Sequence, residues 1–141
     1  MLSHADQRVR VGAELELAKR KAWPALAEIA SNAKQPLFAR IHALWGYGIG
    51  LRREKVSAEP ILELLGDRDP EVLAQCAKVL GDSTLDDAAK QRLLPLLSHT
   101  EVRVRFFAAI ALGKLECPQA LQPLLACAAK DGADAFTRHA I

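Results

Sequence analysis

Apolar positions recur along the chain at helical spacing, in units of about 32 residues. Each unit contains an equivalent pair of positions. In the first four units, a small side chain lies four residues after the first member of the pair and a large one lies eight residues after it. The pairs are Val9-Arg10, Ala39-Arg40, Val72-Leu73, Val104-Arg105 and Thr137-Arg138; the small residues are Ala13, Ala43, Cys76 and Ala108; the large ones are Leu17, Tyr47, Leu80 and Leu112. Positions four and eight apart share one face of an α-helix. The pattern predicts an amphipathic first helix in each unit, with both columns buried.

A proline motif predicts a second helix in each unit. The tetrapeptides at 23–26, 59–62, 94–97 and 122–125 all read x-Pro-x-Leu. Proline is tolerated in the first turn of a helix, because the N–H that it lacks has no intrahelical partner there. Asp69-Pro70 adds a start signal for the third unit. We expect one domain over 1–141, with helix pairs at 3–35, 36–67, 68–99 and 100–132 and a partial fifth at 133–141.

A longer duplication supports this register. Residues 3–10 recur as residues 98–105, and serine, histidine, an acid, arginine, valine and a second arginine keep their spacing. The offset of 95 residues divides into three units of about 32 residues. The chain is therefore predicted to be all-α, with units that stack on one another.

The repeat resembles the HEAT-like family, in the short form also found in phycobilisome-lyase-type repeats. The resemblance is carried by residues 69–72 (Asp-Pro-Glu-Val), Ala77, residues 80–82 (Leu-Gly-Asp) and the x-Pro-x-Leu motifs. The tetratricopeptide and ankyrin signatures are missing. The resemblance implies an α-solenoid, or superhelix, of about four helix pairs that leaves one curved face for a ligand.

A narrower resemblance concerns residues 37–46 and the later Arg138-His139-Ala140. They look like the helical-repeat region of large bacterial membrane-bound dehydrogenases, in which a β-propeller precedes and a haem-c segment follows. No catalytic residue carries over from that family. Because residues 137–141 read as the start of a helix, we expect a piece of a longer protein. The expected compartment is the cytoplasm if the chain is complete and the periplasm if it belongs to a larger secreted protein.

Composition agrees with helices and gives little sign of the ligand. Half of the residues are hydrophobic but only 5% are aromatic, and leucine and alanine are strong helix formers. The 19 Lys and Arg against 17 Asp and Glu leave a net charge of +2, which does not favour nucleic acid or a membrane surface. No apolar run reaches the roughly 18 residues that span a bilayer, so membrane insertion is not expected.

A column of arginines is the most suggestive polar feature. Its members are Arg10, Arg40, Arg105 and Arg138, and an acid lies four residues before three of them: Asp6, Glu101 and Asp134. That spacing places acid and base on one helix face, which predicts a structural ladder of ion pairs. A row of phosphate-binding arginines is the functional alternative, and Leu73 interrupts it.

Two basic clusters, at 19–21 and 52–55, lie at the ends of the first helices of units one and two. Cations there interact favourably with the helix dipole, or they bind an acidic partner or nucleic acid. Trp23, Arg52 and Arg53 are the candidates for such a partner surface. The exposed leucines expected at the other end, Leu121, Leu124 and Leu125 with Phe107, predict weak self-association through the C-terminal end.

The sequence offers no constellation that supports catalysis, a metal or a cofactor. Cys76, Cys117 and Cys127 form no CxxC pair, and the glycines of residues 45–50 end a helix and do not open a phosphate loop. The predicted function is therefore non-catalytic protein–protein interaction or scaffolding with an unknown protein partner. The alternatives are a HEAT-like nucleic-acid binder or DNA glycosylase, and an accessory lyase-like protein.

Overall fold

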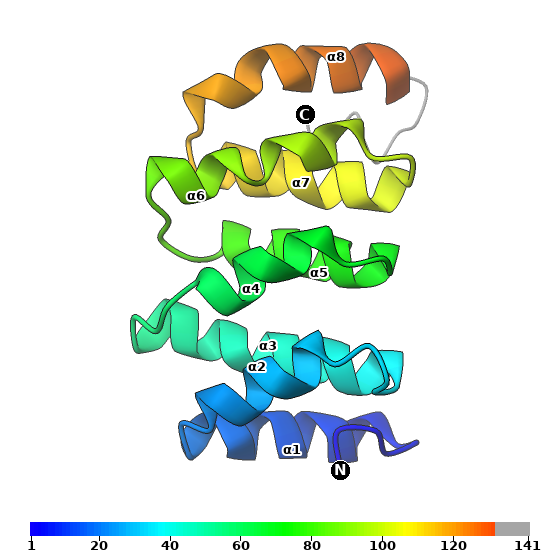
Figure 1. Cartoon of the computed structure of the whole chain (residues 1–141), viewed down its shortest axis with the longest axis vertical. Coiled ribbons are helices and arrows are strands. Elements are labelled where there is room, and N and C mark those ends of the chain that lie inside the picture. Colours follow the sequence, from blue (N-terminus) through cyan, green and yellow to red (C-terminus); the bar gives the residue numbers. More distant parts are fainter. Residues whose placement is uncertain (132–141) are drawn as a thin grey trace.

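The computed structural model describes residues 1–131, of which 73% are helical and none lies in a strand. The helices lie across the long axis of the molecule, one above another (Figure 1). One layer contains the four first helices: α1 (Gln7–Lys19), α3 (Leu37–Arg53), α5 (Pro70–Gly81) and α7 (Val102–Lys114). The prediction of an all-α solenoid is confirmed.

The second layer contains shorter helices, several of which include a 3-10 turn. They are α2 (Trp23–Ser31), α4 (Glu59–Glu63) with η1 (Leu64–Gly66), α6 (Asp87–Gln91) with η2 (Leu94–Ser98), and η3 (Pro118–Ala120) with α8 (Leu121–Asp131). In Figure 1, α2, α4 and α6 lie in front of the first layer. Pro24 and Pro60 lie in the first turn of α2 and α4, as the proline motif predicts.

The third unit corrects that prediction. Its second helix begins at Asp87, where the Asp86 side chain accepts a hydrogen bond from the Ala89 N–H at 2.8 Å. Pro95 lies in the first turn of the 3-10 helix η2, but well inside the second segment as a whole. Proline cannot donate to the carbonyl of Gln91, and its ring clashes with that carbonyl. The α-helix consequently ends at Gln91, and the chain continues as the 3-10 turn η2.

The first helices begin and end through local signals. Asp6 and Asp69 are N-cap residues whose carboxylates accept from backbone N–H groups two residues later, at 2.8 and 2.9 Å. After α1, α3 and α7 the chain reverses through Lys21, Lys55 and Glu116, which have positive φ angles of 55°, 53° and 50°. Left-handed backbone at this position is a common helix ending, although glycine usually occupies it.

The core follows the predicted columns in every unit except the first. Ala43, Cys76 and Ala108 are fully buried, as are Leu80 and Leu112. Ala13 and Leu17 of α1 are only half-buried, contrary to the prediction. Among the described residues, no helix packs on the outer side of α1, so its apolar stripe lines an open groove.

Gly81 sets the closest approach between first helices. A Cβ added to it would lie 2.6 Å from Cα of Ala111, a distance that side-chain atoms do not tolerate. The glycine therefore allows α5 and α7 to pack backbone against backbone. Close packing of these two helices increases the apolar surface that is removed from water between the third and fourth units.

Candidate functional site

The arginine column binds backbone carbonyls. One guanidinium nitrogen of Arg10 donates to the carbonyls of His4 and Ala5, at 2.7 and 2.8 Å. Arg105 repeats this arrangement, donating to the carbonyls of His99 and Thr100 at 2.6 and 2.7 Å. Each arginine thus ties the loop before its helix to the helix itself.

The predicted partners of the ladder need correction. The Asp6 carboxylate forms its ion pair with Arg8, at 2.8 Å, while Arg10 turns toward the loop carbonyls. The hydrogen bonds from Arg8 hold the pKa of Asp6 below its ordinary value. Glu101 is the N-cap residue of α7, with no capping bond from its side chain. Asp134 and Arg138 lie outside the described residues.

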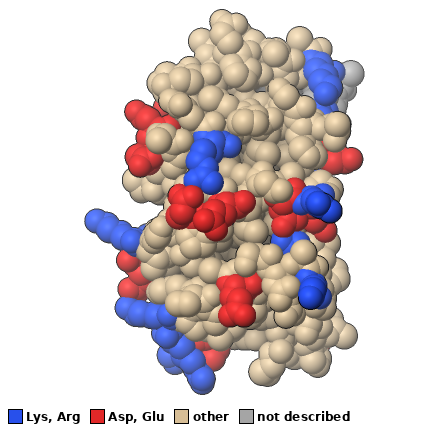
Figure 2. Space-filling view, in the orientation of Figure 1, with Lys and Arg blue, Asp and Glu red and all other residues tan. Residues whose placement is uncertain are grey.

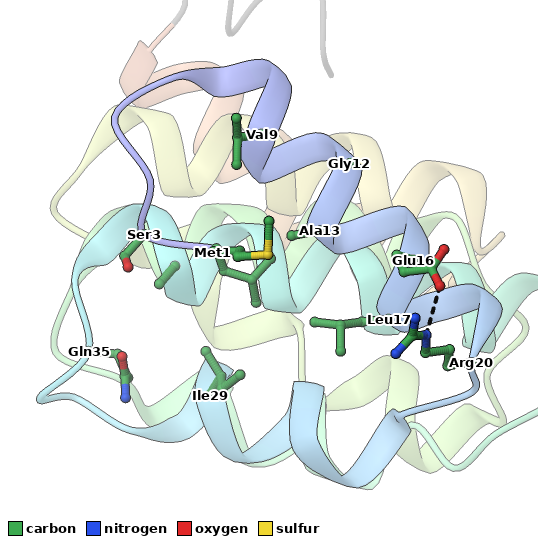
Figure 3. Close-up of a pocket in the computed structure, with 12 residues that line it drawn as sticks. Met1, Ser3, Val9, Gly12, Ala13, Glu16, Leu17, Arg20, Ile29 and Gln35 are labelled. Carbon is green, nitrogen blue, oxygen red and sulfur yellow. Dashed lines mark hydrogen bonds and ion pairs between the residues drawn. The ribbon is translucent and has the colours of Figure 1, made fainter.

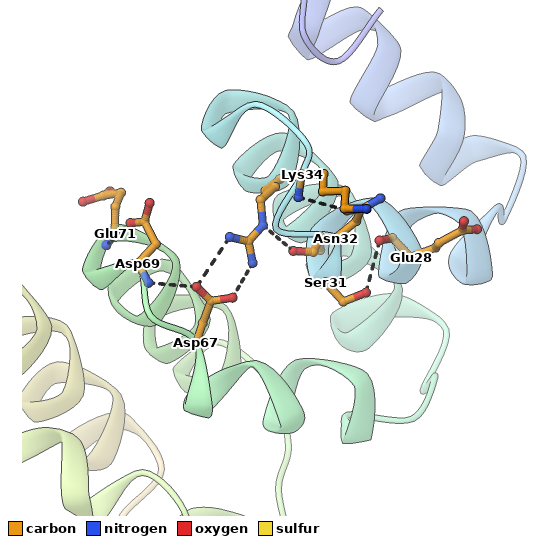
Figure 4. A network of polar contacts seen from close by, with 9 residues as sticks. Glu28, Ser31, Asn32, Lys34, Asp67, Asp69 and Glu71 are labelled. Atoms are coloured by element: carbon orange, nitrogen blue, oxygen red, sulfur yellow. Dashed lines mark hydrogen bonds and ion pairs between the residues drawn. The ribbon is translucent and has the colours of Figure 1, made fainter.

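Arg40 is buried, with 4% of its surface exposed, as is Arg105 of the same column, with 2%. Its Nε donates to the Ala30 carbonyl at 2.8 Å, and its terminal nitrogens reach the Asp67 carboxylate (Figure 4). Burial alone would raise the pKa of Asp67, but hydrogen bonds from Arg40 and from backbone N–H groups outweigh it and lower the pKa. Arg40 therefore joins the end of α2 in the first unit to the segment that leads from η1 into α5.

A second polar network starts at the interface of α1 and α3. Nε of Arg10 donates to Nε2 of His42 at 3.1 Å, and Nδ1 of His42 lies 2.8 Å from the Glu14 carboxylate. A guanidinium can only donate, so Nε2 must accept. The neutral ring therefore carries its proton on Nδ1 and donates it to Glu14. Burial raises the pKa of Glu14, and the His42 hydrogen bond opposes that shift.

The network continues across α3, α5 and α7. The Trp45 ring packs edge-on against His42, with centroids 5.0 Å apart, and its Nε1 donates to Gln75 at 2.8 Å. The Gln75 amide donates to Glu71 at 2.7 Å, and Arg103 donates to the same carboxylate at 2.6 Å. Contacts therefore run without a break from α1 to α7.

Three aromatic side chains lie along this network, each beneath a cation. We call the set the aromatic ridge. The three cation–ring distances are 4.9, 5.8 and 5.0 Å, measured to the ring centroid, within the range of attractive cation–π contacts. The pairs are Arg10 over Phe38, Lys78 over Trp45, and Arg103 over Phe107. Phe38 is 61% exposed, and Trp45 and Phe107 are half-buried.

Exposed ion pairs link consecutive units at separations of 32 or 33 residues. Their nitrogen–oxygen distances are 2.6 or 2.7 Å. The pairs are Lys21–Glu54, Arg92–Glu59, Arg103–Glu71 and Lys114–Asp82. Each contributes little stability in water, yet the spacing equals one unit. Opposite charges one repeat apart are the sequence signal that would have revealed them, with the acid first in three pairs and the base first in Lys21–Glu54.

The predicted partner residues Trp23 and Arg53 come together, whereas Arg52 does not join them. A hollow of about 250 Å³ lies between the ends of α1 and α3 and the start of α2. It is lined by Leu15, Ala18, Lys19, Lys21, Trp23, Ile49, Arg53 and Glu54. We call it the Trp23 hollow. Arg52 points toward Gly48 and stabilises the charge of Glu14.

A larger groove, of about 760 Å³, lies between α1 and α2 (Figure 3). Val9, Ala13 and Leu17 of α1 face Ile29 of α2 across it, with Met1 between them. The Glu16–Arg20 ion pair, at 2.7 Å, lies at one end. The groove is the unfilled side of the first unit, which explains the half-exposed column.

The visible second-layer face carries mixed charge. In Figure 2 lysines and arginines alternate with acids, and positive side chains gather mainly at the lower left edge, where α1 and α3 end. Within residues 1–131 no helix is long and apolar enough to cross a membrane. In the same range no group of three or more His, Cys, Asp or Glu side chains could hold a metal ion.

Comparison with known families identifies the repeat. HEAT repeats match residues 57–141, more than half of the chain. No curated protein matches it. HEAT repeats commonly act as protein-interaction or scaffolding modules and are generally not catalytic. The helix pairs, their stacking and this match agree, and the chain belongs to the HEAT repeat family.

Proposed function

We propose that this protein is a non-catalytic binding or scaffolding module that contacts a protein partner through the aromatic ridge. The observation that carries the proposal is the placement of three aromatic side chains, each with its own cation, along four consecutive first helices. Tryptophan and arginine are enriched among the residues that dominate the affinity of protein interfaces.

The ridge is supported from beneath. Trp45 is fixed by its hydrogen bond to Gln75 and by the edge contact with His42, and Arg103 is fixed by Glu71. Side chains that are already ordered lose less conformational entropy when a partner binds. A partner would therefore meet a surface that needs little rearrangement.

The acid of the ridge favours protein over nucleic acid. Glu71 is 28% exposed beside Arg103, and Glu71 also accepts from Gln75. A carboxylate at this position would repel a phosphate backbone. The experiment below can also support one of the alternatives. These are a nucleic-acid binder or glycosylase, an accessory lyase-like protein, and the repeat region of a dehydrogenase.

The test compares two exposed substitutions on the ridge with two elsewhere. The ridge variant combines Phe38→Ser and Lys78→Glu, and its control combines Leu125→Ser and Arg68→Glu; all four side chains are exposed. Each immobilised protein captures partners from an extract of its source cells, and the bound proteins are quantified by mass spectrometry. We expect one or more proteins retained by wild type and control to fall about tenfold on the ridge variant.

Two results would contradict the proposal. Equal capture by the ridge variant and its control would show that the ridge is not the interface. Loss of all capture after nuclease treatment would favour the nucleic-acid alternative. Circular dichroism and thermal unfolding of both variants check that each remains folded.

A further inference from the structure

We propose that the Trp23 hollow binds an acidic segment of a partner protein, which inserts one apolar side chain between Lys19 and Arg53. The inference rests on the proposed function as a protein-binding module. It concerns residues that the aromatic ridge does not use.

The floor of the hollow is apolar and held in place. The Trp23 ring packs over Gly50, where an added Cβ would lie 3.0 Å from it, and edge-on to Tyr47 with centroids 6.4 Å apart. Tyr47 is itself anchored by donating to the Ser57 carbonyl at 2.8 Å. Leu15 completes the wall and is 53% exposed. The site is thus formed before any ligand arrives.

The size of the hollow favours a side chain. Its volume of about 250 Å³ lies below the roughly 300–1,000 Å³ of pockets that enclose small molecules. One leucine or phenylalanine side chain would cover the half-buried Trp23 ring and the exposed Leu15. Burial of that apolar surface would supply the non-electrostatic part of the affinity.

The rim has an excess of positive charge. Of the residues that line the hollow, three are cations, Lys19, Lys21 and Arg53, and one is an acid, Glu54. Lys21 pairs with Glu54. Among the described residues, Lys19 and Arg53 have no ion-pair partner and are exposed. Two cations without ion-pair partners beside an apolar floor complement a segment that carries acids next to an apolar residue.

Helix dipoles do not account for so many cations. Helices α5 and α7 each have a single lysine in the last turn, Lys78 and Lys114. By the same measure α1 has Lys19 and α3 has Arg52 and Arg53, and Lys21 follows the end of α1. Because the ends of α1 and α3 line one hollow, three cations gather there, where the ends of α5 and α7 have one each.

The experiment measures binding of labelled peptides to the whole purified chain by fluorescence anisotropy. The probe has a central leucine flanked on both sides by aspartate and glutamate. In one twin peptide serine replaces the leucine, and in another asparagine and glutamine replace the acids. We expect saturable binding of the probe that weakens as salt is added, and at least about tenfold weaker binding of either twin.

Substitutions then locate the site. Arg53→Glu should weaken probe binding about tenfold and Leu15→Ser about threefold. Neither should disturb folding, because both side chains are exposed. Arg68→Glu is the matched control, since it makes the same charge change before the N-terminal end of α5, and it should leave binding unchanged.

Several results would overturn the inference. The first is that the probe shows no saturable binding, or binds no more tightly than its twins. The second is that probe binding is unchanged by Arg53→Glu. The third is that a labelled single-stranded oligonucleotide binds more tightly than the probe in a manner that depends on Arg53. Failure here and failure of the ridge are separable. Capture that depends on Phe38 and Lys78 tests the ridge without involving any residue of the hollow.

Discussion

Residues 1–20 and 96–115 are two copies of one sequence pattern that meet different surroundings. Their local structures agree closely. Nδ1 of His4 accepts from the Asp6 N–H, and Nδ1 of His99 accepts from the Glu101 N–H, both at 3.0 Å. Arg10 and Arg105 also bind equivalent loop carbonyls. Local hydrogen bonding therefore does not depend on the neighbouring unit.

Burial, by contrast, differs between the copies. Leu112 is 1% exposed because α5 and η2 pack against α7, whereas Leu17 is half-buried beside the groove. Glu16 and Arg20 stand where the fourth unit has Ala111 and Leu115, both buried. Polar replacements of this kind suit a helix face that, among the described residues, no neighbouring unit covers.

The inter-unit ion pairs show the same contrast. Lys114 reaches Asp82 on α5, and Arg103 reaches Glu71. The equivalent residues of the first copy are Lys19 and Arg8. Within the described residues Lys19 has no acidic partner, and Arg8 pairs locally with Asp6. Lys19 is thereby left available at the Trp23 hollow.

The largest expected effect tests burial directly. Leu112→Ala should lower the free energy of unfolding by about 3 kcal/mol, since it leaves a cavity in the packed core. Leu17→Ala should cost only about 1 kcal/mol, because water already reaches the groove. Urea denaturation of both variants measures the difference. Equal losses would mean that the groove is closed in solution.

The arginines should differ less. Arg105→Ala should lower the free energy of unfolding by about 2 kcal/mol, because two carbonyls lose their donor in a buried site. Arg10→Ala should cost about 1 kcal/mol, since its surroundings are half-exposed. Arg53→Ala is the control and should change stability little. If all three variants unfold like wild type in urea, the column has no structural role.

Two glutamates should respond to pH in opposite directions. Burial raises the pKa of Glu14, so its contribution to stability is complete below the unfolded pKa and is lost as pH rises through the folded pKa. For Glu71, burial raises the pKa, but hydrogen bonds from Arg103 and Gln75 lower it overall. Its contribution is complete above the unfolded pKa and is lost as pH falls.

The measurement compares the free energy of unfolding of each glutamine variant with that of wild type from acidic to neutral pH. The stability advantage of wild type over Glu14→Gln should shrink as pH rises above the ordinary pKa of glutamate, and its advantage over Glu71→Gln should shrink as pH falls below that value. Chemical denaturation at a series of pH values gives both differences. Slopes of the same sign for the two variants would contradict the assignment.

The smallest effects should be the same in both copies, because they are local. Lys21 and Glu116 occupy left-handed backbone, which costs a residue with a Cβ about 1 kcal/mol or more. Glu116→Gly should raise the free energy of unfolding by about 0.5–1 kcal/mol. Lys21→Gly should gain slightly less, since it also loses the ion pair with Glu54.

A matched substitution within a helix checks that prediction. Lys19 is the last residue of α1, so Lys19→Gly should lower the free energy of unfolding by about 0.5–1 kcal/mol, through the poor helix propensity of glycine. Thermal unfolding followed by circular dichroism distinguishes the signs. A stabilising Lys19→Gly, or a destabilising Glu116→Gly, would show that backbone conformation is not the deciding term.

The sequence was informative wherever the physics is local. The small and large columns placed the first helices, and Asp69-Pro70 placed the start of α5. It failed at Pro95, because the motif by itself does not say how far upstream a helix has already begun. It also failed for the partners of Arg10, because a four-residue spacing cannot tell whether a side chain turns to the acid or to a loop carbonyl.

Of the candidate surfaces, Trp23 and Arg53 could be named from the basic clusters, but the aromatic ridge could not. Phe38, Trp45 and Phe107 have no common spacing in the sequence. They lie along one network only because α3, α5 and α7 pack side by side, so that Lys78 meets Trp45 and Arg103 meets Glu71.

The sequence by itself determined the helical repeat, its period and the N-cap at Asp69, because helix periodicity and capping depend on residues within a few positions of one another. Only the tertiary structure decided which members of each column are buried, where the groove and the Trp23 hollow lie, and that His42 forms a hydrogen bond with Glu14. These properties depend on which surfaces the stacked units bring together, and residues about 30 positions apart in the chain supply them.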